Sequence, residues 1–347
     1  MPDAPRPDVS IIIAHLDDLA VLQACLDSVA RLRGPSFEVI LIDNGAQDGT
    51  SDWAARHRPE IRMIRNPVNL GFAPAANQGA RAARGRYLLF LNDDTTVPPE
   101  LLERLLAPLE ADPTIGAGQP KIFWMGRPGE LDSIGEFPTW TGFLQHGGHR
   151  EQDAGQTTAP VTDIFSPKGA CLLVRAELFH RVGGFDDDFF AYCEETDLAW
   201  RIQLSGARIV LISTTGIQHR VGHTTTRRLR FSAIQFHSHK NRFAVYLKNL
   251  GGLRLLGVLA VNGALTTGLA VAALLCGKGA RAAAIARAFG WNLRHLPATW
   301  RKRRFVQREL RRRSDRQVLQ PFLRPATLDR AWRGGLVWYV RAQEQSS

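Results

Sequence analysis

Cysteine and methionine are scarce in this chain of 347 residues, which holds four cysteines and three methionines. The cysteines, Cys25, Cys171, Cys193 and Cys276, show no close pairing and no Cys-x-x-Cys spacing. This pattern excludes a disulfide framework and a zinc site of that type, and it indicates reduced, mostly buried thiols of a protein that faces the cytosol. The first residues also lack the basic start and apolar run of a signal peptide, so we do not expect secretion.

Acidic residues are almost missing from the last third of the chain. Residues 227–347 hold 24 Lys and Arg against 4 Asp and Glu, whereas residues 1–226 hold 20 basic and 29 acidic residues. The chain therefore has two electrostatic halves of opposite sign. Its length allows one large domain of catalytic size plus a further region, which we expect at 1–226 and 227–347.

Short apolar runs alternate with helical patterns through the first half. The spacing predicts strands at 9–13, 37–42, 61–64 and 87–91, and helices at 19–29, 73–83 and 99–109. This alternation predicts βαβ units, and hence an α/β fold built on a parallel sheet. In such sheets, ligands bind at the carboxyl ends of the strands.

Polar residues follow two of these predicted strands. Asp43 opens a glycine-rich loop that can accept hydrogen bonds from a base or a ribose, and Asn92, Asp93 and Asp94 follow the strand at 87–91. Adjacent carboxylates repel each other, and a bound divalent cation relieves that repulsion. Each loop alone is at least as typical of an Asx-turn or a helix cap as it is of a ligand site. Their joint occurrence at two strand ends favours a ligand site.

Three carboxylates, Glu194, Glu195 and Asp197, lie within four residues and are flanked by Phe, Tyr and Trp. Carboxylates among buried aromatic residues have perturbed pKa values, which is the property that a general base needs. A structural interpretation is equally open for this segment alone. Glu194 and Glu195 would then complement a helix dipole, and Asp197 would pair with Arg201 one turn later.

Together these segments resemble the inverting family 2 glycosyltransferases of the GT-A fold, particularly their bacterial rhamnosyltransferase-like and galactofuranosyltransferase-like branch. The resemblance extends over residues 9–223. It rests on segments 9–13, 39–44, 69–73, 77–79, 89–95, 169–175, 182–186 and 194–201. Each segment alone is a weak signal, but the set in this order is highly specific. The resemblance implies a Rossmann-like nucleotide-diphospho-sugar transferase fold, with a mixed, mainly parallel sheet and flanking helices.

The resemblance also implies the donor half of the site, at about 1–123. The implied donor-binding residues are Asp43 for the nucleotide base, Asn92 and Asp93 for the ribose or diphosphate, and Asn69, Gly71 and Asn77. Asp94 would hold a divalent metal, Mg²⁺ or Mn²⁺, and His219 matches a histidine of the family that contacts the metal or the diphosphate. Hard oxygen ligands suit both ions, and imidazole is better tolerated by Mn²⁺.

The acceptor half is expected at about 124–226. Glu195 matches the catalytic carboxylate of the family, and Glu194, Gly169, Trp124 and Trp140 are assigned to the acceptor side. We expect residues 124–167 to form loops over the site, because they are rich in Gly and Thr. Trp124, Trp140 and Phe143 suit stacking on sugar rings, and closing a core beneath long loops is an equal alternative.

The sequence departs from the family pattern in three places. Ala14-His15-Leu16-Asp17-Asp18 replaces the usual Pro-Thr-Tyr-Asn or Asn-Tyr-Asn, Asn92 replaces Asp at the start of the metal motif, and the catalytic pair is Glu-Glu instead of Glu-Asp. The contacts normally made after the first strand are therefore open. The roles of His15 and His223 also stay open between ligand binding and structure.

The implied reaction is a single in-line displacement with inversion. Glu195 would take a proton from an acceptor hydroxyl while that oxygen attacks the anomeric carbon of a dTDP- or UDP-sugar. The sugar would be rhamnose or galactofuranose, and the acceptor a lipid-linked cell-surface glycan. The alternative function is a catalytically silent relative that serves as a membrane scaffold or glycan-binding subunit.

Long charge-free stretches are rare in this chain, but residues 255–276 are such a stretch, with 22 residues and no charge. Residues 278–316 follow with 13 Lys and Arg, interspersed with apolar residues. We interpret residues 278–316 as basic amphipathic helices that lie on an anionic membrane, at the cytoplasmic face of the inner membrane. A single membrane span at 255–276 is an option. We do not expect nucleic acid as a partner, because aromatics are sparse and no nucleic-acid-binding motif is present. A solvated helical appendage or an oligomerisation arm is the third possibility.

Overall fold

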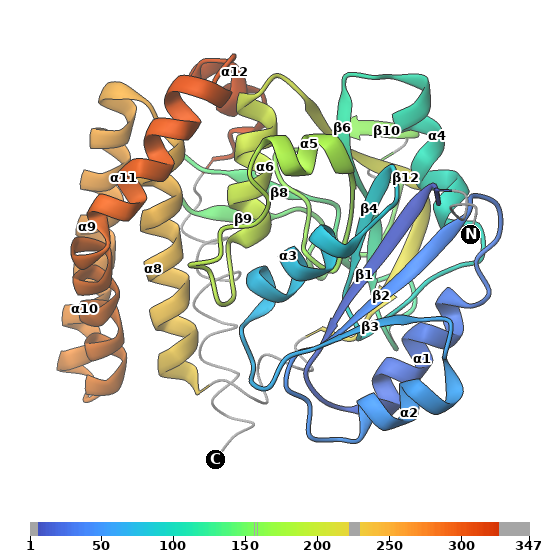
Figure 1. Cartoon of the computed structure of the whole chain (residues 1–347). Coiled ribbons are helices and arrows are strands. Elements are labelled where there is room, and N and C mark those ends of the chain that lie inside the picture. The colour runs from blue at the N-terminus through green and yellow to red at the C-terminus, as the bar shows by residue number, and fades with distance from the viewer. Residues whose placement is uncertain (1–5, 156, 158, 222–229, 326–347) are drawn as a thin grey trace.

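A computed structural model describes residues 6–155, 157, 159–221 and 230–325. The predicted alternation is present in its first half (Figure 1). The strands are β1 (Val9–His15), β2 (Phe37–Asp43), β3 (Arg62–Arg65) and β4 (Tyr87–Leu91), and the helices are α1 (Leu19–Val29), α2 (Thr50–His57), α3 (Phe72–Ala82) and α4 (Leu101–Ala111). Helix α2 was not predicted, because its eight residues hold few apolar positions.

One mixed sheet forms the centre of the protein, in the order β10-β12-β6-β11-β4-β1-β2-β3. Its remaining strands are β5 (Thr95–Thr96), β6 (Ile115–Trp124), β7 (Leu131–Ser133), β10 (Val161–Asp163), β11 (Cys171–Arg175) and β12 (Arg208–His219). Strands β1 to β4 pair in parallel, as does β12 with β6, and β11 runs antiparallel between β4 and β6. The prediction of a mixed, mainly parallel sheet is therefore confirmed.

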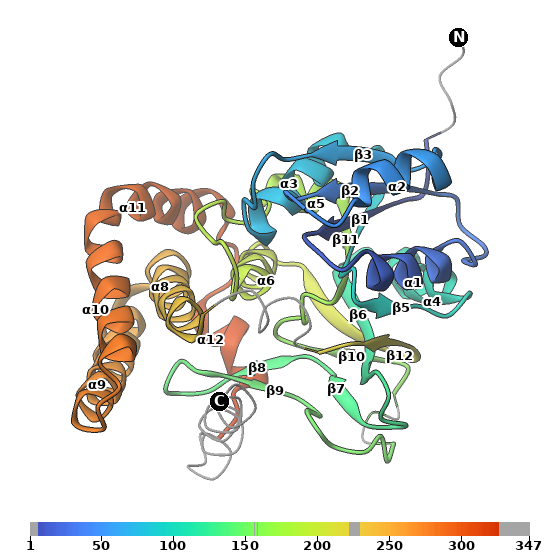
Figure 2. The same cartoon turned by 90° about the horizontal axis from the view of Figure 1, so that it is seen from below.

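Alternate residues of the buried strands face two apolar cores, one on each side of the sheet. Ile11 and Ile13 pack with α1 and α4, whereas Ile12 belongs to the core that includes α3 and α6 (Glu194–Leu204). Helix α3 lies close to the sheet because it is rich in small residues: a Cβ on Gly79 would come within 2.5 Å of the Ile12 side chain. Figure 2 shows these helices on either side of the strands.

Short strands interrupt the segment that was expected to form loops. Strands β8 (Glu136–Pro138) and β9 (Leu144–His146) form a separate two-stranded hairpin, while β7 and β10 join the main sheet. Each of these strands is three residues long. That length is too short for an alternating apolar pattern to be recognised in the sequence.

The second half is helical, with α5 (Ala176–Arg181), α8 (Phe231–Asn249), α9 (Gly252–Leu275), α10 (Gly279–Arg294), α11 (Leu296–Phe305) and α12 (Asp315–Leu319). Helix α8 packs against α6, and α10 packs against both α8 and α9 (Figures 1 and 2). Helix α9 has 24 residues. Its most apolar stretch of 18 residues has a mean hydropathy of 1.9, and 17% of that stretch is buried. By length and composition it could cross a membrane.

Candidate active site

The carboxyl ends of β1, β2 and β4 meet at one edge of the sheet, and the predicted donor-side acids lie there. Asp43 is the last residue of β2, and Asp93 follows β4. The backbone N–H of Ala46 donates to Asp43 at 2.8 Å, and the Ser51 hydroxyl donates to its other oxygen. The buried Asp43 carboxylate is therefore held in place by its own loop.

His15, whose role was open, is completely buried at the end of β1. Its Nδ1 lies 2.7 Å from Asp93 and its Nε2 lies 3.0 Å from Asp48. Burial favours the neutral ring, but hydrogen bonds and the charges of the two carboxylates raise the pKa of His15 above its usual value. The histidine that replaces the family residue thus bridges two loops at the donor edge and fixes Asp93.

Three residues assigned to donor binding hold loops together. Asn69 accepts a hydrogen bond from the backbone of Gly71 at 2.8 Å. Gly71 has a φ of 87°, and a Cβ there would lie 2.4 Å from the carbonyl oxygen of Phe190. The Asn77 amide donates to Phe185 and Asp187 and accepts from the Phe185 backbone. These contacts fasten α3 to the loop that precedes Glu194.

Asp94 and His219 come together through the pairing of β5 with β12, in which His219 lies opposite Thr95. His219 Nε2 is 3.3 Å from Asp94 Oδ1, and His219 Nδ1 is 2.8 Å from Asp132. Asp132 is fully buried and also pairs with Lys168 at 2.6 Å. Although burial favours the neutral ring, the neighbouring carboxylates of Asp132 and Asp94 raise the pKa of His219 to about 9. This position therefore favours positive charge.

Glu194 and Glu195 are the first two residues of α6. Each has one buried carboxylate oxygen that accepts no hydrogen bond from the described residues. Burial raises the pKa of Glu195 to about 7, and the charge of Glu136 adds to the rise. Burial and then the charge of Glu195 raise the pKa of Glu194 well above its usual value. The expectation of perturbed carboxylates in this cluster is confirmed.

Asp197 is a structural partner, as its spacing from Arg201 predicted. The Arg201 guanidinium donates two hydrogen bonds to it, at 2.8 and 3.0 Å. Lys248 and Asn249 of α8 bind its other oxygen, at 2.9 and 2.8 Å. Burial alone would favour the protonated acid, but these cations lower its pKa. Asp197 therefore joins α6 to α8 instead of facing a ligand.

Helix α8 also holds the backbone turn just before Glu194. Tyr192 and Cys193 both have positive φ angles, 73° and 66°, which non-glycine residues rarely adopt. Asn241 donates to the carbonyl oxygens of Ala191 and Tyr192 at 2.8 and 2.7 Å. These bonds stabilise the unusual turn that begins α6, and thereby the direction of its first two carboxylates.

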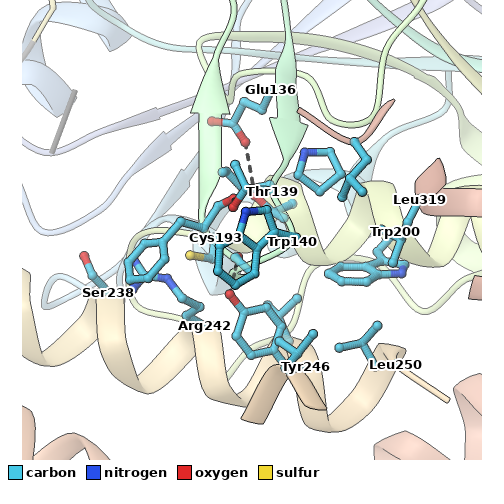
Figure 3. Close-up of a pocket in the computed structure, with 18 of the residues that line it drawn as sticks. Glu136, Thr139, Trp140, Cys193, Trp200, Ser238, Arg242, Tyr246, Leu250 and Leu319 are labelled. Atoms are coloured by element: carbon cyan, nitrogen blue, oxygen red, sulfur yellow. Dashed lines mark hydrogen bonds between the residues drawn. The ribbon is translucent and has the colours of Figure 1, made fainter. Parts of the chain in front are cut away.

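A cavity of about 340 Å³ lies between α6, α8 and the β8–β9 hairpin, and Glu195 forms part of its wall (Figure 3). Trp140 and Phe143, which suit stacking on sugar rings, line it too. Gly169 lies beside the carboxylate, since a Cβ there would be 3.5 Å from Glu195 Oε1. Trp124 lies elsewhere, stacked 4.5 Å from the Arg127 guanidinium.

Sequence analysis missed several polar residues of this site. Glu136 lines the cavity, pairs with His146 at 3.0 Å and accepts a hydrogen bond from Thr196. Asp132 supports His219, as described above. A weak signal existed, because both acids lie in an otherwise mostly apolar stretch at 131–137. His223, whose role was also open, lies outside the described residues.

The fold and this arrangement of acids at the strand ends define a class, the GT-A glycosyltransferases. Solved structures of this class match the chain at low sequence identity and so show the fold alone. GalNAc-T7 with UDP, GalNAc and Mn²⁺ has a TM-score of 0.55 at 17% identity, over 71% of this chain and 48% of that one. TarS 1-349 of S. aureus in complex with UDP-GlcNAc has a TM-score of 0.55 at 15% identity, over 86% of this chain and 90% of that one.

The sequence comparisons go further than the fold. The family model described as Glycosyl transferase family 2 matches residues 10–161, and that of Glycosyl transferase family group 2 matches residues 87–277, more than half of the chain. The chain belongs to the family 2 glycosyltransferases, in the rhamnosyltransferase-like branch that its motifs predicted.

Two curated relatives illustrate the range of this branch. The O-antigen biosynthesis protein RfbC of Myxococcus xanthus is 30% identical over 258 residues, which are 71% of this chain and 19% of that protein. The N-acetylglucosaminyl-diphospho-decaprenol L-rhamnosyltransferase of Mycobacterium tuberculosis is 28% identical over 232 residues, which are 59% of this chain and 74% of that protein. The chain spans about a fifth of the first relative's length.

Proposed function

We propose that this enzyme is an inverting glycosyltransferase that moves rhamnose or galactofuranose from a dTDP- or UDP-sugar to a hydroxyl of a lipid-linked cell-surface glycan. The observation that carries the proposal is the partly buried Glu195 carboxylate in the wall of the cavity, whose pKa is raised by burial to about 7. A group with that pKa accepts a proton efficiently at neutral pH. Glu195 takes the acceptor proton as the oxygen attacks the anomeric carbon, and the nucleoside diphosphate departs from the opposite face.

The assignment of the base to Glu195, and not to Glu194, rests on position and protonation. Glu195 lines the cavity. The pKa of Glu194 is raised well above its usual value by burial and by the Glu195 charge, which favours its protonated form. A protonated Glu194 beside an ionised Glu195 resembles other carboxyl pairs in which the environment separates the two pKa values. We assign Glu194 the role of a neighbour that tunes the base.

Asp94 and His219 fit a divalent cation, Mg²⁺ or Mn²⁺. Asp94 Oδ1 is buried and accepts no hydrogen bond from the described residues, and it faces His219 Nε2. Asp132 binds the other ring nitrogen, an arrangement that orients a metal-binding histidine. No group of three His, Cys, Asp or Glu side chains suited to a metal occurs within the described ranges, so the donor diphosphate would supply further ligands. The cation would neutralise negative charge on the departing diphosphate.

The remaining donor-side residues fall into two groups. Asp43, Asn92 and Asp93 lie at the strand ends, where we propose that they contact the nucleotide. We propose that Asn69, Gly71 and Asn77 act indirectly, by holding the loops around the donor site in place. Their polar atoms already bind neighbouring loops. We retain the division at about residue 123 between the donor and acceptor halves, within a catalytic domain at 1–226.

Membrane attachment is part of the proposal, through the helices of 227–347. The support is α9, whose exposed apolar side chains include Leu253 at 85% exposure and Leu275 at 83%. Basic residues of α10 and α11 lie beside it in sequence and would attract anionic lipid headgroups. A peripheral position at the cytoplasmic face of the inner membrane would bring the catalytic cavity to a lipid-linked acceptor.

A panel of nucleotide sugars tests the proposed function. The full chain is mixed with Mn²⁺ and each of several dTDP-, UDP- and GDP-sugars, and thermal unfolding is followed. A true donor raises the unfolding temperature, since it binds only the folded state. Transfer or slow hydrolysis of that donor should then be metal-dependent. A well-folded protein that binds and turns over no nucleotide sugar would instead be the catalytically silent relative.

A further inference from the structure

The catalytic cavity has two chemically different ends. Glu136, His146 and Glu195 are polar groups of its wall at the β8–β9 hairpin and the start of α6. Much of the remaining wall is apolar, with side chains from α8, α9 and the end of the chain that the structure describes. These apolar residues are Val245, Leu250, Val258, Leu319 and Leu323. An apolar wall of this kind suits a ligand with a hydrocarbon part, such as an amphiphile, better than it suits a free sugar.

Two arginines lie in this wall without an anionic partner in the described part of the chain. Arg242 projects from α8 into the cavity, and its guanidinium carbon lies 4.3 Å from the centre of the Phe143 ring (Figure 3). Its Nη1 is buried and has no hydrogen-bond partner among the described residues. Arg254, from the first turn of α9, is exposed and lines the same cavity. A buried guanidinium N–H without a partner is costly, and an anion that enters the cavity would satisfy it.

Helix α9 contributes both to the wall of the cavity and to the exposed apolar surface of the protein. Val258 faces the cavity, and Asn262, one turn later, is buried and donates to the carbonyl oxygen of Thr141 at 3.2 Å. That bond fixes which side of α9 faces the protein. Other positions of α9 expose apolar residues to the surroundings: Leu256, Leu265, Val271 and Leu274. One helix therefore serves as a wall of the catalytic cavity and as an exposed apolar surface.

We propose that this cavity binds the phosphate-bearing part of a lipid acceptor. The diphosphate, or phosphate, of an isoprenoid lipid binds Arg242 and Arg254, and the first hydrocarbon units lie along Val258 and its apolar neighbours. The attached sugar then points to Glu195. This inference rests on the proposed function, and it names a recognition site for the acceptor, whereas the strand-end acids serve the donor.

Binding of farnesyl diphosphate to the full-length protein in detergent tests this site. Titration calorimetry is carried out with the donor site already filled by Mn²⁺ and the nucleotide that binds best in the donor panel. We expect farnesyl diphosphate to bind under these conditions. Farnesol and inorganic diphosphate should each bind at least about tenfold more weakly, because each lacks one half of the recognised ligand. If inorganic diphosphate alone binds as tightly, the apolar wall has no role and the proposal fails.

The variants Arg242→Met and Arg254→Met should each raise the Kd of farnesyl diphosphate by about tenfold or more, since each removes a charged hydrogen-bond donor. Arg287→Met is the matched control, because Arg287 is exposed on α10 outside the cavity. Unchanged Kd values in both cavity variants would overturn the proposal, as would displacement of the lipid by excess nucleotide. Nucleotide binding confirms that each variant is folded, and if Arg242→Met fails to fold, the exposed Arg254→Met decides.

The two proposals fail in different ways. A protein that binds no nucleotide sugar refutes the proposed function, whatever it does with lipids. A protein that binds its donor but shows the same affinity for farnesyl diphosphate with and without Arg242 and Arg254 refutes the acceptor site alone.

Discussion

Two strand-end acids, Asp43 and Asp93, differ from the two acids that begin α6 in how fully their carboxylates are hydrogen-bonded. At the donor edge, Asp43 accepts hydrogen bonds from a backbone N–H and a hydroxyl, and Asp93 is bonded to His15. At the start of α6, Glu194 and Glu195 each keep a buried oxygen without a hydrogen-bond donor among the described side chains and backbone. Paired carboxylates stay ionised, while unpaired buried ones are driven toward protonation.

This difference matches the two tasks that we assign to the regions. A carboxylate that binds a ligand works best with a fixed position and a fixed charge. A general base must gain and lose a proton, so its pKa has to lie near the working pH. The same side-chain chemistry thus serves binding or catalysis according to how many hydrogen-bond donors surround it.

The largest effect is expected from Glu195→Gln, which keeps the shape but removes the base. Turnover should fall by about 10²- to 10⁴-fold, the usual contribution of general base catalysis. Donor affinity, measured by calorimetry, should stay the same. Glu177→Gln is the matched control, because the Glu177 side chain is 91% exposed on α5. Full activity in Glu195→Gln would move the base to another residue.

Asp132→Asn is expected to have the next largest effect, by loosening the orientation of His219. Loss of such a supporting carboxylate typically weakens metal affinity by about 10- to 100-fold. Donor binding should therefore need more Mn²⁺, which a titration of donor affinity against Mn²⁺ concentration measures. The exposed Asp52 supplies the control, Asp52→Asn. An unchanged Mn²⁺ requirement would separate Asp132 from the metal site.

Asn241→Ala should weaken the acceptor region while sparing the donor edge. Two partly buried carbonyl groups, those of Ala191 and Tyr192, would lose their donor, and each such loss costs at most about 1–3 kcal/mol. We expect a lower free energy of unfolding and a lower kcat, with the donor Kd unchanged. Chemical denaturation and steady-state kinetics measure these quantities. A rise in donor Kd of the same size as the fall in kcat would indicate general unfolding instead.

The smallest effect is a shift in pH dependence on Glu136→Gln. Activity of the wild type should rise with pH through about 7 as Glu195 ionises. The negative charge of Glu136 opposes that ionisation, so its removal lowers the pKa of Glu195 and moves the acidic limb of the kcat/KM profile to lower pH. Glu177→Gln should leave the limb in place. A shift toward higher pH would show that Glu136 does not face an ionised base.

The positions of the strand-end acids could be predicted well from the sequence, because their signals are local. Continuous apolar runs identify β2 and β4, and the residues that follow them in sequence, Asp43 and Asp94, are necessarily at the strand ends. The acceptor region was harder to predict. Glu136 belongs to a strand of three residues, and its contacts with Thr196 and His146 depend on how the hairpin lies against α6.

The basic balance of the last third was interpreted as a membrane-directed surface, and the structure changes part of that interpretation. Lys248 is 2% exposed and pairs with Asp186 and Asp197, while Lys302 pairs with Asp186 and Asp188. Some of the positive charge therefore neutralises acids of the first 226 residues inside the protein. A count of charges contains no information about which face of a helix carries them, so the pairing of these lysines with acids of the first 226 residues could not be predicted.

Helices α8 and α11 both contact the segment that leads to Glu194, at residues 186–192. These contacts limit how the protein can be shortened in the laboratory. Removing residues 250–347 to obtain a more soluble fragment would delete α9, but also Lys302, a partner of Asp186 and Asp188. Such a fragment would lose activity for reasons unrelated to lipid. Polar substitutions at exposed positions of α9, such as Leu253 and Leu275, change its affinity for detergent and leave those supports intact.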